Sequence, residues 1–270
     1  MEEKLFDTIQ ESISNYQYTS MRYIDYGEVC NYDIVSNTEQ LVLLCGYYDP
    51  AKAFEYHWAA NKAEDIIALI DKKESLITFV PQEWIKTFEG AGFYIRSAWH
   101  DHFKSSLSDI VDEVKDAIVL KDSECKEASE VTMSCRYKSR GFTGETEEFF
   151  REWLSDNDKD HPNSIIFVEK NDIGEIVGLV CTTTYGHGSE KGPVAWIREV
   201  CVRPEYQNRG IARKLILQAL SHGKKHGATR AFLAADEMNE NAIHLYTSIG
   251  FEPSKEESQI DMIKYEEVLV

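Results

Sequence analysis

The sequence predicts a mixed α/β fold whose basic pattern occurs twice along the chain. One observation is a strand-like run at residues 195–202 that leads through a turn into an amphipathic helix. The second is a short strand, helix and Gly-Phe turn at Leu76–Phe93, which recurs in the same order near residue 250. Strands that alternate with helices in this way are typical of a sheet flanked by helices.

The first half carries this pattern without its polar residues. When Gly92-Phe93 is aligned on Gly250-Phe251, Phe88 falls on Tyr246, so a phenyl ring replaces a phenol. A helix is expected over residues 63–72, but no glycine precedes it that could open a ligand-binding turn. We interpret the first half as a degenerate copy of the second half that lacks a cofactor site.

The two halves are expected to divide in a charge-rich segment, with a first domain over residues 1–120 and a second over 127–270. The second domain is expected to open with a strand at residues 131–137, whose letters VTMSCRY are of β type. A helix follows at residues 145–154, and a hairpin turns at Asn171-Asp172-Ile173-Gly174.

Residues 195–202 form the expected central strand of the second half. They hold Trp, Ile, Val and Cys around one Arg-Glu pair, and Pro204 ends them because proline cannot donate to a central ladder. The period of two along a strand puts Ile197, Glu199 and Cys201 on one face.

An amphipathic helix is expected next, from near Arg209 to near His226. The N-terminus of such a helix offers unpartnered N–H groups and partial positive charge, which suit a phosphate. Gly210 lets a ligand approach the backbone closely, and Arg213 and Lys214 add charge. The glycine alone also fits an ordinary strand–helix crossover; the whole segment favours a pyrophosphate cradle.

Three motifs follow one another in the second half. They are Val200-Cys201-Val202-Arg203-Pro204-Glu205, Gln207-x-x-Gly210-x-Ala212, and Asn239-x-x-Ala242-Ile243-x-Leu245-Tyr246-x-x-x-Gly250-Phe251. In this order they resemble the central motifs of the GNAT superfamily of acyl-CoA-dependent N-acetyltransferases. The resemblance covers most of residues 127–270, and the first half looks like a degenerate GNAT-like copy.

The resemblance implies tandem GNAT-like folds, each a twisted, mostly antiparallel sheet with flanking helices and a splayed central strand pair. It implies acetyl-CoA as the cosubstrate, with strand backbone groups pairing with the pantetheine arm and the turn amides holding the pyrophosphate. The cofactor-binding residues that it implies are Val200, Cys201, Val202, Gln207, Asn208, Arg209, Gly210, Ile211, Ala212, Arg213 and Asn239.

Two residues are candidates for proton transfer. The resemblance places Tyr246 beside the thioester sulfur, where a phenol of pKa about 10 is able to protonate a thiolate whose thiol has a pKa of about 8.5. Glu199 is the candidate base for the acceptor amine, although family members differ in this residue. The structural alternatives are a core aromatic at position 246 and a solvated Arg198–Glu199 pair. Phe142, Phe149 and residues 185–190 are expected at the acceptor.

Composition limits the other functions. The formal net charge of −18 argues against nucleic-acid binding, which needs basic patches. Six cysteines without a CxxC pair, and no signal-like or long apolar segment, favour a cytoplasmic protein with reduced thiols and no membrane span. His100-Asp101-His102 is not expected to bind a metal, because adjacent strand residues point apart.

We therefore expect an enzyme that transfers acetyl from acetyl-CoA to a primary amine by direct attack, without a metal. A small-molecule acceptor is favoured, and the chain is expected to be a monomer or homodimer. The alternative is a non-catalytic CoA-binding regulatory or scaffold protein with the same fold. A different acyl group also stays open.

Overall fold

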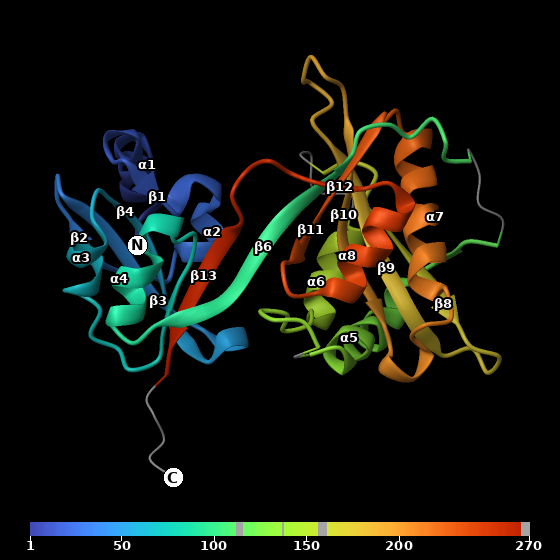
Figure 1. The fold of residues 1–270 in the computed structure, drawn as a ribbon, viewed down its shortest axis with the longest axis horizontal. Coiled ribbons are helices and arrows are strands. Elements are labelled where there is room, and N and C mark those ends of the chain that lie inside the picture. Colours follow the sequence, from blue (N-terminus) through green and yellow to red (C-terminus); the bar gives the residue numbers. More distant parts are fainter. Residues whose placement is uncertain (112–115, 137, 156–160, 266–270) are drawn as a thin grey trace, which may run out of the picture. The chain divides into compact units, whose positions relative to one another are not determined.

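The structure, a computed structural model, describes residues 1–111, 116–136, 138–155 and 161–265 (Figure 1). The chain forms two compact units, the first comprising residues 1–99 with 257–265 and the second comprising residues 100–256. The strand β6 (Tyr94–Lys104) contributes residues to both units. Among the described residues, no helix is both long and apolar enough to cross a membrane.

The first unit is a mixed sheet in the order β2-β3-β4-β5-β13-β6, in which β1 also pairs with β4. Strands β4 and β5 run parallel, and the other registered pairs are antiparallel. One face packs against α3 and α4 and the other against α1 and α2. Its elements are α1 (Glu3–Ser12), η1 (Ile13–Asn15), β1 (Tyr18–Thr19), η2 (Met21–Tyr23), α2 (Tyr26–Val29), β2 (Asp33–Asn37), β3 (Leu41–Tyr48), η3 (Asp49–Ala51), β4 (Ala53–Ala60), α3 (Ala63–Ile67), β5 (Ser75–Ile77), η4 (Gln82–Trp84), α4 (Ile85–Gly90) and β13 (Gln259–Lys264).

The second unit is a mixed sheet in the order β6-β11-β10-β9-β8-β7, in which β12 also pairs with β6. Strands β10 and β11 run parallel. Helices α7 and α8 cover one face, and α5 and α6 pack on the other. Its further elements are β7 (Ile118–Val119), η5 (Asp122–Glu124), α5 (Cys125–Ser134), α6 (Glu147–Leu154), β8 (Ile165–Lys170), β9 (Ile176–Tyr185), β10 (Val194–Val202), η6 (Pro204–Tyr206), α7 (Ile211–Lys225), β11 (Arg230–Asp236), α8 (Glu240–Ile249) and β12 (Glu252–Pro253). The predicted fold class is confirmed.

The edges of the two units differ from the predicted domains over 1–120 and 127–270. Residues 100–120 lie in the second unit, whereas residues 257–265 lie in the first. The reason is strand pairing, because β13 inserts between β5 and β6 of the first unit. The division into folding domains stays a prediction.

The strand predicted at residues 131–137 is wrong, because residues 125–134 form helix α5; residue 137 lies outside the described residues. Cys125, Ala128, Val131 and Cys135 are buried at helical spacing. Their burial against the sheet outweighs the β propensity of the valine and threonine. The predicted helix near residues 145–154 and the hairpin at Asn171–Gly174 are confirmed.

The helix ends before the two Gly-Phe turns have the same geometry. The N–H of Phe93 donates to the Phe88 carbonyl at 3.0 Å, and the N–H of Phe251 donates to the Tyr246 carbonyl at 3.0 Å. The intervening glycines have φ of +89° and +96°, the left-handed conformation that closes a helix. The equivalence of Phe88 and Tyr246 is therefore supported by backbone structure as well as by sequence.

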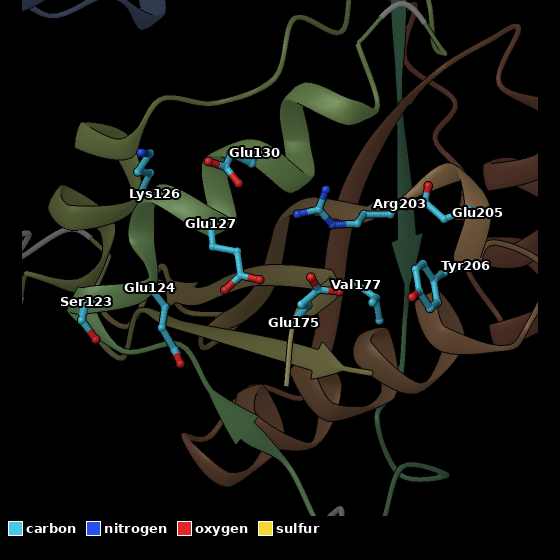
Figure 2. A pocket seen from close by; sticks show the side chains of 10 residues that line it. All are labelled: Ser123, Glu124, Lys126, Glu127, Glu130, Glu175, Val177, Arg203, Glu205 and Tyr206. Carbon is cyan, nitrogen blue, oxygen red and sulfur yellow. The ribbon is translucent and has the colours of Figure 1, made fainter. Parts of the chain in front are cut away.

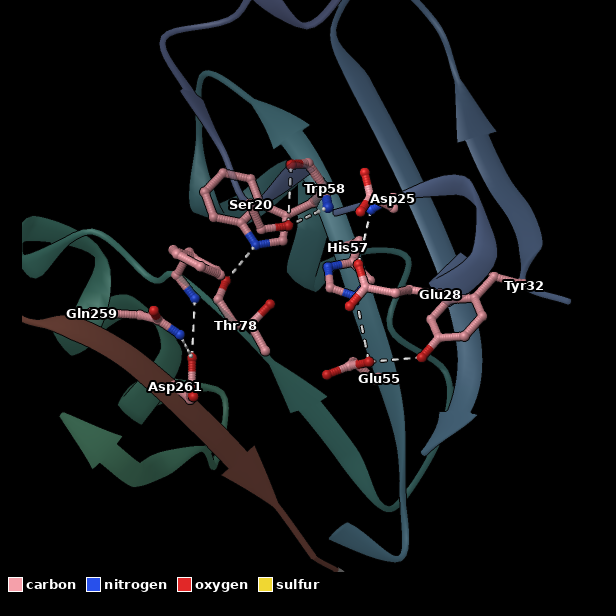
Figure 3. A network of polar contacts seen from close by, with 11 residues as sticks. Ser20, Asp25, Glu28, Tyr32, Glu55, His57, Trp58, Thr78, Gln259 and Asp261 are labelled. Carbon is pink, nitrogen blue, oxygen red and sulfur yellow. Dashed lines mark hydrogen bonds and ion pairs between the residues drawn. The ribbon is translucent and has the colours of Figure 1, made fainter. Parts of the chain in front are cut away.

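The first unit differs from the second where its parallel strands end their pairing. The register of β4 and β5 stops at Tyr56–Ile77, and the indole of Trp58 then bridges the strands by donating to the Thr78 carbonyl at 3.0 Å (Figure 3). Only residues 61–62 connect β4 to α3, whereas residues 203–210 connect β10 to α7. A buried side chain thus fills the space that a ligand would need, and the loop that would hold a phosphate is missing.

Replacing Trp58 with alanine tests whether this indole holds the first unit together. The variant loses a fully buried ring and leaves the Thr78 carbonyl without its donor, so we expect the free energy of unfolding to fall by about 3–5 kcal/mol. Urea denaturation measures the loss, with Tyr47→Ala as control because that ring is 55% exposed. Equal losses in the two variants would contradict the assignment.

Candidate functional site

Strands β10 and β11 separate early in the second unit. Their parallel register joins Val194 to Arg230, Ala195 to Ala231 and Trp196 to Phe232. Beyond that point β10 continues to Val202 and β11 to Asp236 without a registered pair between them. This is the predicted splayed pair.

The backbone of β10 faces the gap at the expected residues. Arg203 donates its N–H to the Val177 carbonyl on the β9 side at 2.8 Å, so the alternation of an antiparallel pair turns Val200 and Val202 away from β9. The Val202 carbonyl accepts from Gln207 Nε2 at 3.0 Å and from Cys135 Sγ at 3.3 Å. The same alternation turns the backbone of Cys201 toward β9, and its thiol lies in the core beside α5. The structure therefore takes Cys201 away from the gap.

The turn after β10 presents six consecutive backbone N–H groups, those of residues 208–213, that have no hydrogen-bond partner among the described residues. The next N–H, of Lys214, donates to the Gly210 carbonyl at 3.0 Å, and α7 begins at Ile211 rather than near Arg209. Asn208 and Gly210 adopt φ of +60° and +79°, and a Cβ added to Gly210 would meet no heavy atom within 4 Å. Such a ring of free amides with open space before it suits a phosphate group.

Two arginines supply most of the positive charge beside these amides. Arg209 lies over the Tyr206 ring at 5.0 Å, and Arg213 donates to the Ser248 hydroxyl. Lys214 is paired with Glu169 at 2.6 Å, so its charge is largely compensated. Gln207 is turned to Val202 and braces the turn.

A β-bulge changes which side chains of β10 face together. Opposite β9 the register passes from Ile197–Thr182 to Glu199–Cys181, which leaves Arg198 as the extra residue. Ile197 therefore packs in the core under α7 and α8, whereas Glu199 lies opposite Cys181 on the face of α5 and α6. The prediction that Ile197 shares a face with Glu199 is wrong, because simple alternation does not hold across a bulge.

The bulge places two neighbouring side chains on one face, where Arg198 and Glu199 form an ion pair. Arg198 also approaches Glu145 at 3.4 Å. The Glu199 side chain is only 8% exposed, so the pair is not the solvated pair of the structural alternative. Burial raises the pKa of Glu199 to about 7; Arg198 lowers it and the nearby Glu145 carboxyl raises it.

Tyr246 lies on α8, and its side chain is buried. Burial raises its pKa above the ordinary value for a phenol, and the Cys201 thiol and Glu199 carboxyl raise it further. No hydrogen bond of its hydroxyl is recorded among the described residues. The phenol is therefore a protonated donor at neutral pH.

Asn239 is the N-cap of α8. Its Oδ1 accepts from the Ala242 N–H at 3.3 Å, so only its side-chain N–H groups are left for the predicted cofactor contact.

The loop at residues 138–146 carries two contacts that the sequence did not indicate. Glu145 reaches Arg198 of β10, and Arg140 Nε donates to both carboxylate oxygens of buried Asp236 on β11 at 3.2 and 3.0 Å. The loop thus touches both separated strands. The partners are 53 and 96 residues apart, so no local signal could reveal them.

A pocket of about 560 Å³ lies beside α5 and the turn that follows β10 (Figure 2). Its lining includes Glu124, Glu127, Glu130, Glu175 and Glu205 against Lys126 and Arg203. This charge repels a phosphate, so the pocket does not extend the cradle. Within the described residues, no group of three or more His, Cys, Asp or Glu side chains is placed to hold a metal ion.

Comparisons with known proteins agree with this geometry. The model of the acetyltransferase (GNAT) family matches residues 127–251. An uncharacterized N-acetyltransferase of Methanocaldococcus jannaschii is 34% identical over 105 residues, which are 38% of this chain and 44% of that protein. A mycothiol acetyltransferase of Thermobispora bispora is 34% identical over 79 residues, which are 29% of this chain and 27% of that protein. The matches thus span less than half the length of these relatives.

Among solved structures, the chain is similar to a tandem GNAT protein from the clavulanic acid biosynthesis pathway. The TM-score is 0.54 at 13% identity, over 83% of this chain and 78% of that chain, which is a likeness of fold. Through residues 127–251, and within a tandem GNAT fold, this chain belongs to the acetyltransferase (GNAT) family.

Proposed function

We propose that the second unit transfers the acetyl group of acetyl-CoA to a primary amine of a small molecule. The observation that carries the proposal is the row of six unpartnered amides at residues 208–213, directly after the strand that has separated from its neighbour. These amides and Arg213 would hold the pyrophosphate, and the backbones of Val200 and Val202 would bind the pantetheine arm as an added strand. Asn239 would donate to the same arm.

Glu199 would act as the base that receives the proton of the acceptor ammonium. With a pKa of about 7 it is largely ionised only above neutral pH, and its burial beside Arg198 fixes its position. The amine nitrogen then bonds to the acetyl carbon as the carbon–sulfur bond breaks.

Tyr246 would donate its proton to the departing thiolate. Its raised pKa keeps the phenol protonated until a stronger base is beside it, and its hydroxyl has no competing partner among the described residues. The equivalent Phe88 of the first unit lacks this oxygen, which is consistent with a single active site in the second unit.

Substitution of Gly210 tests the cradle. Gly210→Ala places a methyl group in the open space before the amides, so we expect CoA affinity to fall at least about tenfold, or about 1.4 kcal/mol. Isothermal titration calorimetry measures it. Gly174→Ala is the matched control, because Gly174 also has positive φ and open space around an added Cβ but lies in the β8–β9 turn. Equal CoA affinities in the two variants would remove the cradle from cofactor binding.

Loss of one phenol oxygen tests the acid. Tyr246→Phe is expected to lower kcat by about 10²–10⁴-fold while the CoA dissociation constant changes little. Thiol release from acetyl-CoA measures turnover, and Tyr206→Phe serves as control for loss of a phenol elsewhere in the unit. Unchanged turnover in Tyr246→Phe would exclude the proposed acid. CoA binding without turnover in the parent protein would favour the non-catalytic alternative.

The pH dependence tests the base. Because the deprotonated carboxylate is the active form, kcat/KM is expected to rise with pH through about 7, for an amine whose own pKa lies well above that window. Glu145→Gln removes a carboxyl that raises the pKa of Glu199, so the rise should move to lower pH. Glu199→Gln should abolish it. A rise at the same pH in all three proteins would exclude Glu199.

A further inference from the structure

Six aromatic side chains form a continuous row on the face of the second unit that carries Glu199. In order they are Phe149, Trp153, Trp196, Tyr185, Phe232 and Phe103, with successive ring centroids 5.7, 6.0, 6.3, 6.5 and 5.3 Å apart. All six are partly or well exposed. We call this set the aromatic row.

Core packing does not account for the part of the row that lies over the separating strands. Trp196 and Phe232 are the last registered pair of β10 and β11, and their neighbours Ala195 and Ala231 lie in the core under α7 and α8. The two rings therefore project from the opposite face. Among the described residues, neither ring belongs to a hydrophobic core cluster, and the same holds for Tyr185 and Phe103.

Charge is distributed unevenly along the aromatic row. At one end, Arg198 lies over the Phe149 ring at 5.5 Å and is paired with Glu199 and Glu145, which leaves one carboxyl in excess. Further along, Asp101 raises the pKa of Tyr185 while Arg230 lowers it, after the larger effect of burial, so their charges oppose each other there. The row is therefore nearly neutral along its length and acidic at the Glu199 end.

We infer that the acceptor is a primary amine joined by a short alkyl arm to an uncharged aromatic ring. The ring would stack on Trp196 and Phe232, and the ammonium group would lie at the Glu199 end. Aromatic stacking and cation–π contact reward such a molecule. A polyamine would place its further positive charges along the neutral, apolar part of the row, where nothing compensates their desolvation. This inference rests on the proposed acetyl transfer, because it assigns the amine end to the base.

A panel of amines tests the inference. With saturating acetyl-CoA, kcat/KM for 2-phenylethylamine and tryptamine is expected to exceed that for n-butylamine and spermidine by at least about tenfold. Equal or higher values for n-butylamine or spermidine would overturn the inference.

Variants of Trp196 give the row its own readout. Trp196→Leu should reduce the ratio of aromatic to aliphatic kcat/KM to near one without changing KM for acetyl-CoA, whereas Trp196→Phe should preserve most of the ratio. Tyr47→Leu, which removes an exposed ring of the first unit, is the control. An unchanged ratio in Trp196→Leu would overturn the inference.

Binding separates this inference from the proposed function. Calorimetric titration of the CoA-loaded protein with 2-phenylethylamine and with n-butylamine measures preference without turnover. Preferential binding of the aromatic amine without any thiol release would refute acetyl transfer and support the aromatic site. Thiol release with no preference in rate or binding would support acetyl transfer and refute the aromatic site.

Discussion

The early separation of β10 from β11 determines what the second unit is able to bind. Backbone N–H and C=O groups inside a protein need partners, and a strand that leaves its neighbour after three registered pairs loses them on one side. The amides of residues 208–213 add a second set without partners where the strand ends. A ligand with an amide-bearing arm and a pyrophosphate satisfies both sets, which makes its binding a consequence of the backbone rather than of a few side chains.

The first unit shows the same topology with this requirement removed. Its parallel register also ends after three pairs, but Trp58 fills the space beyond and donates to Thr78. The crossover that follows is too short to form a cradle. Phe88 then replaces Tyr246 at a helix end of the same geometry. Within one chain, the fold is thus retained by apolar packing while the polar groups that a cofactor would need are absent.

The sequence predicted most of the fold and the cradle because their signals are local. Glycine at the start of a helix and the spacing of apolar residues act within one or two turns of chain, so Gly210 and α7 could be recognised. The bulge at Arg198 could not, because strand alternation carries no mark of an extra residue. Helix α5 was missed because burial outweighed its β-type letters, and Glu145 because its partners are distant in sequence.

The central claim is that one chain holds one cofactor site, built by the separated strands of the second unit. A crystal structure of the protein with CoA tests it most directly. The account predicts one CoA molecule per chain, with its pyrophosphate on the amides of residues 208–213 and its arm along Val200 and Val202. Pyrophosphate density elsewhere, or a CoA molecule between β4 and β5 in place of the Trp58 indole, would contradict it.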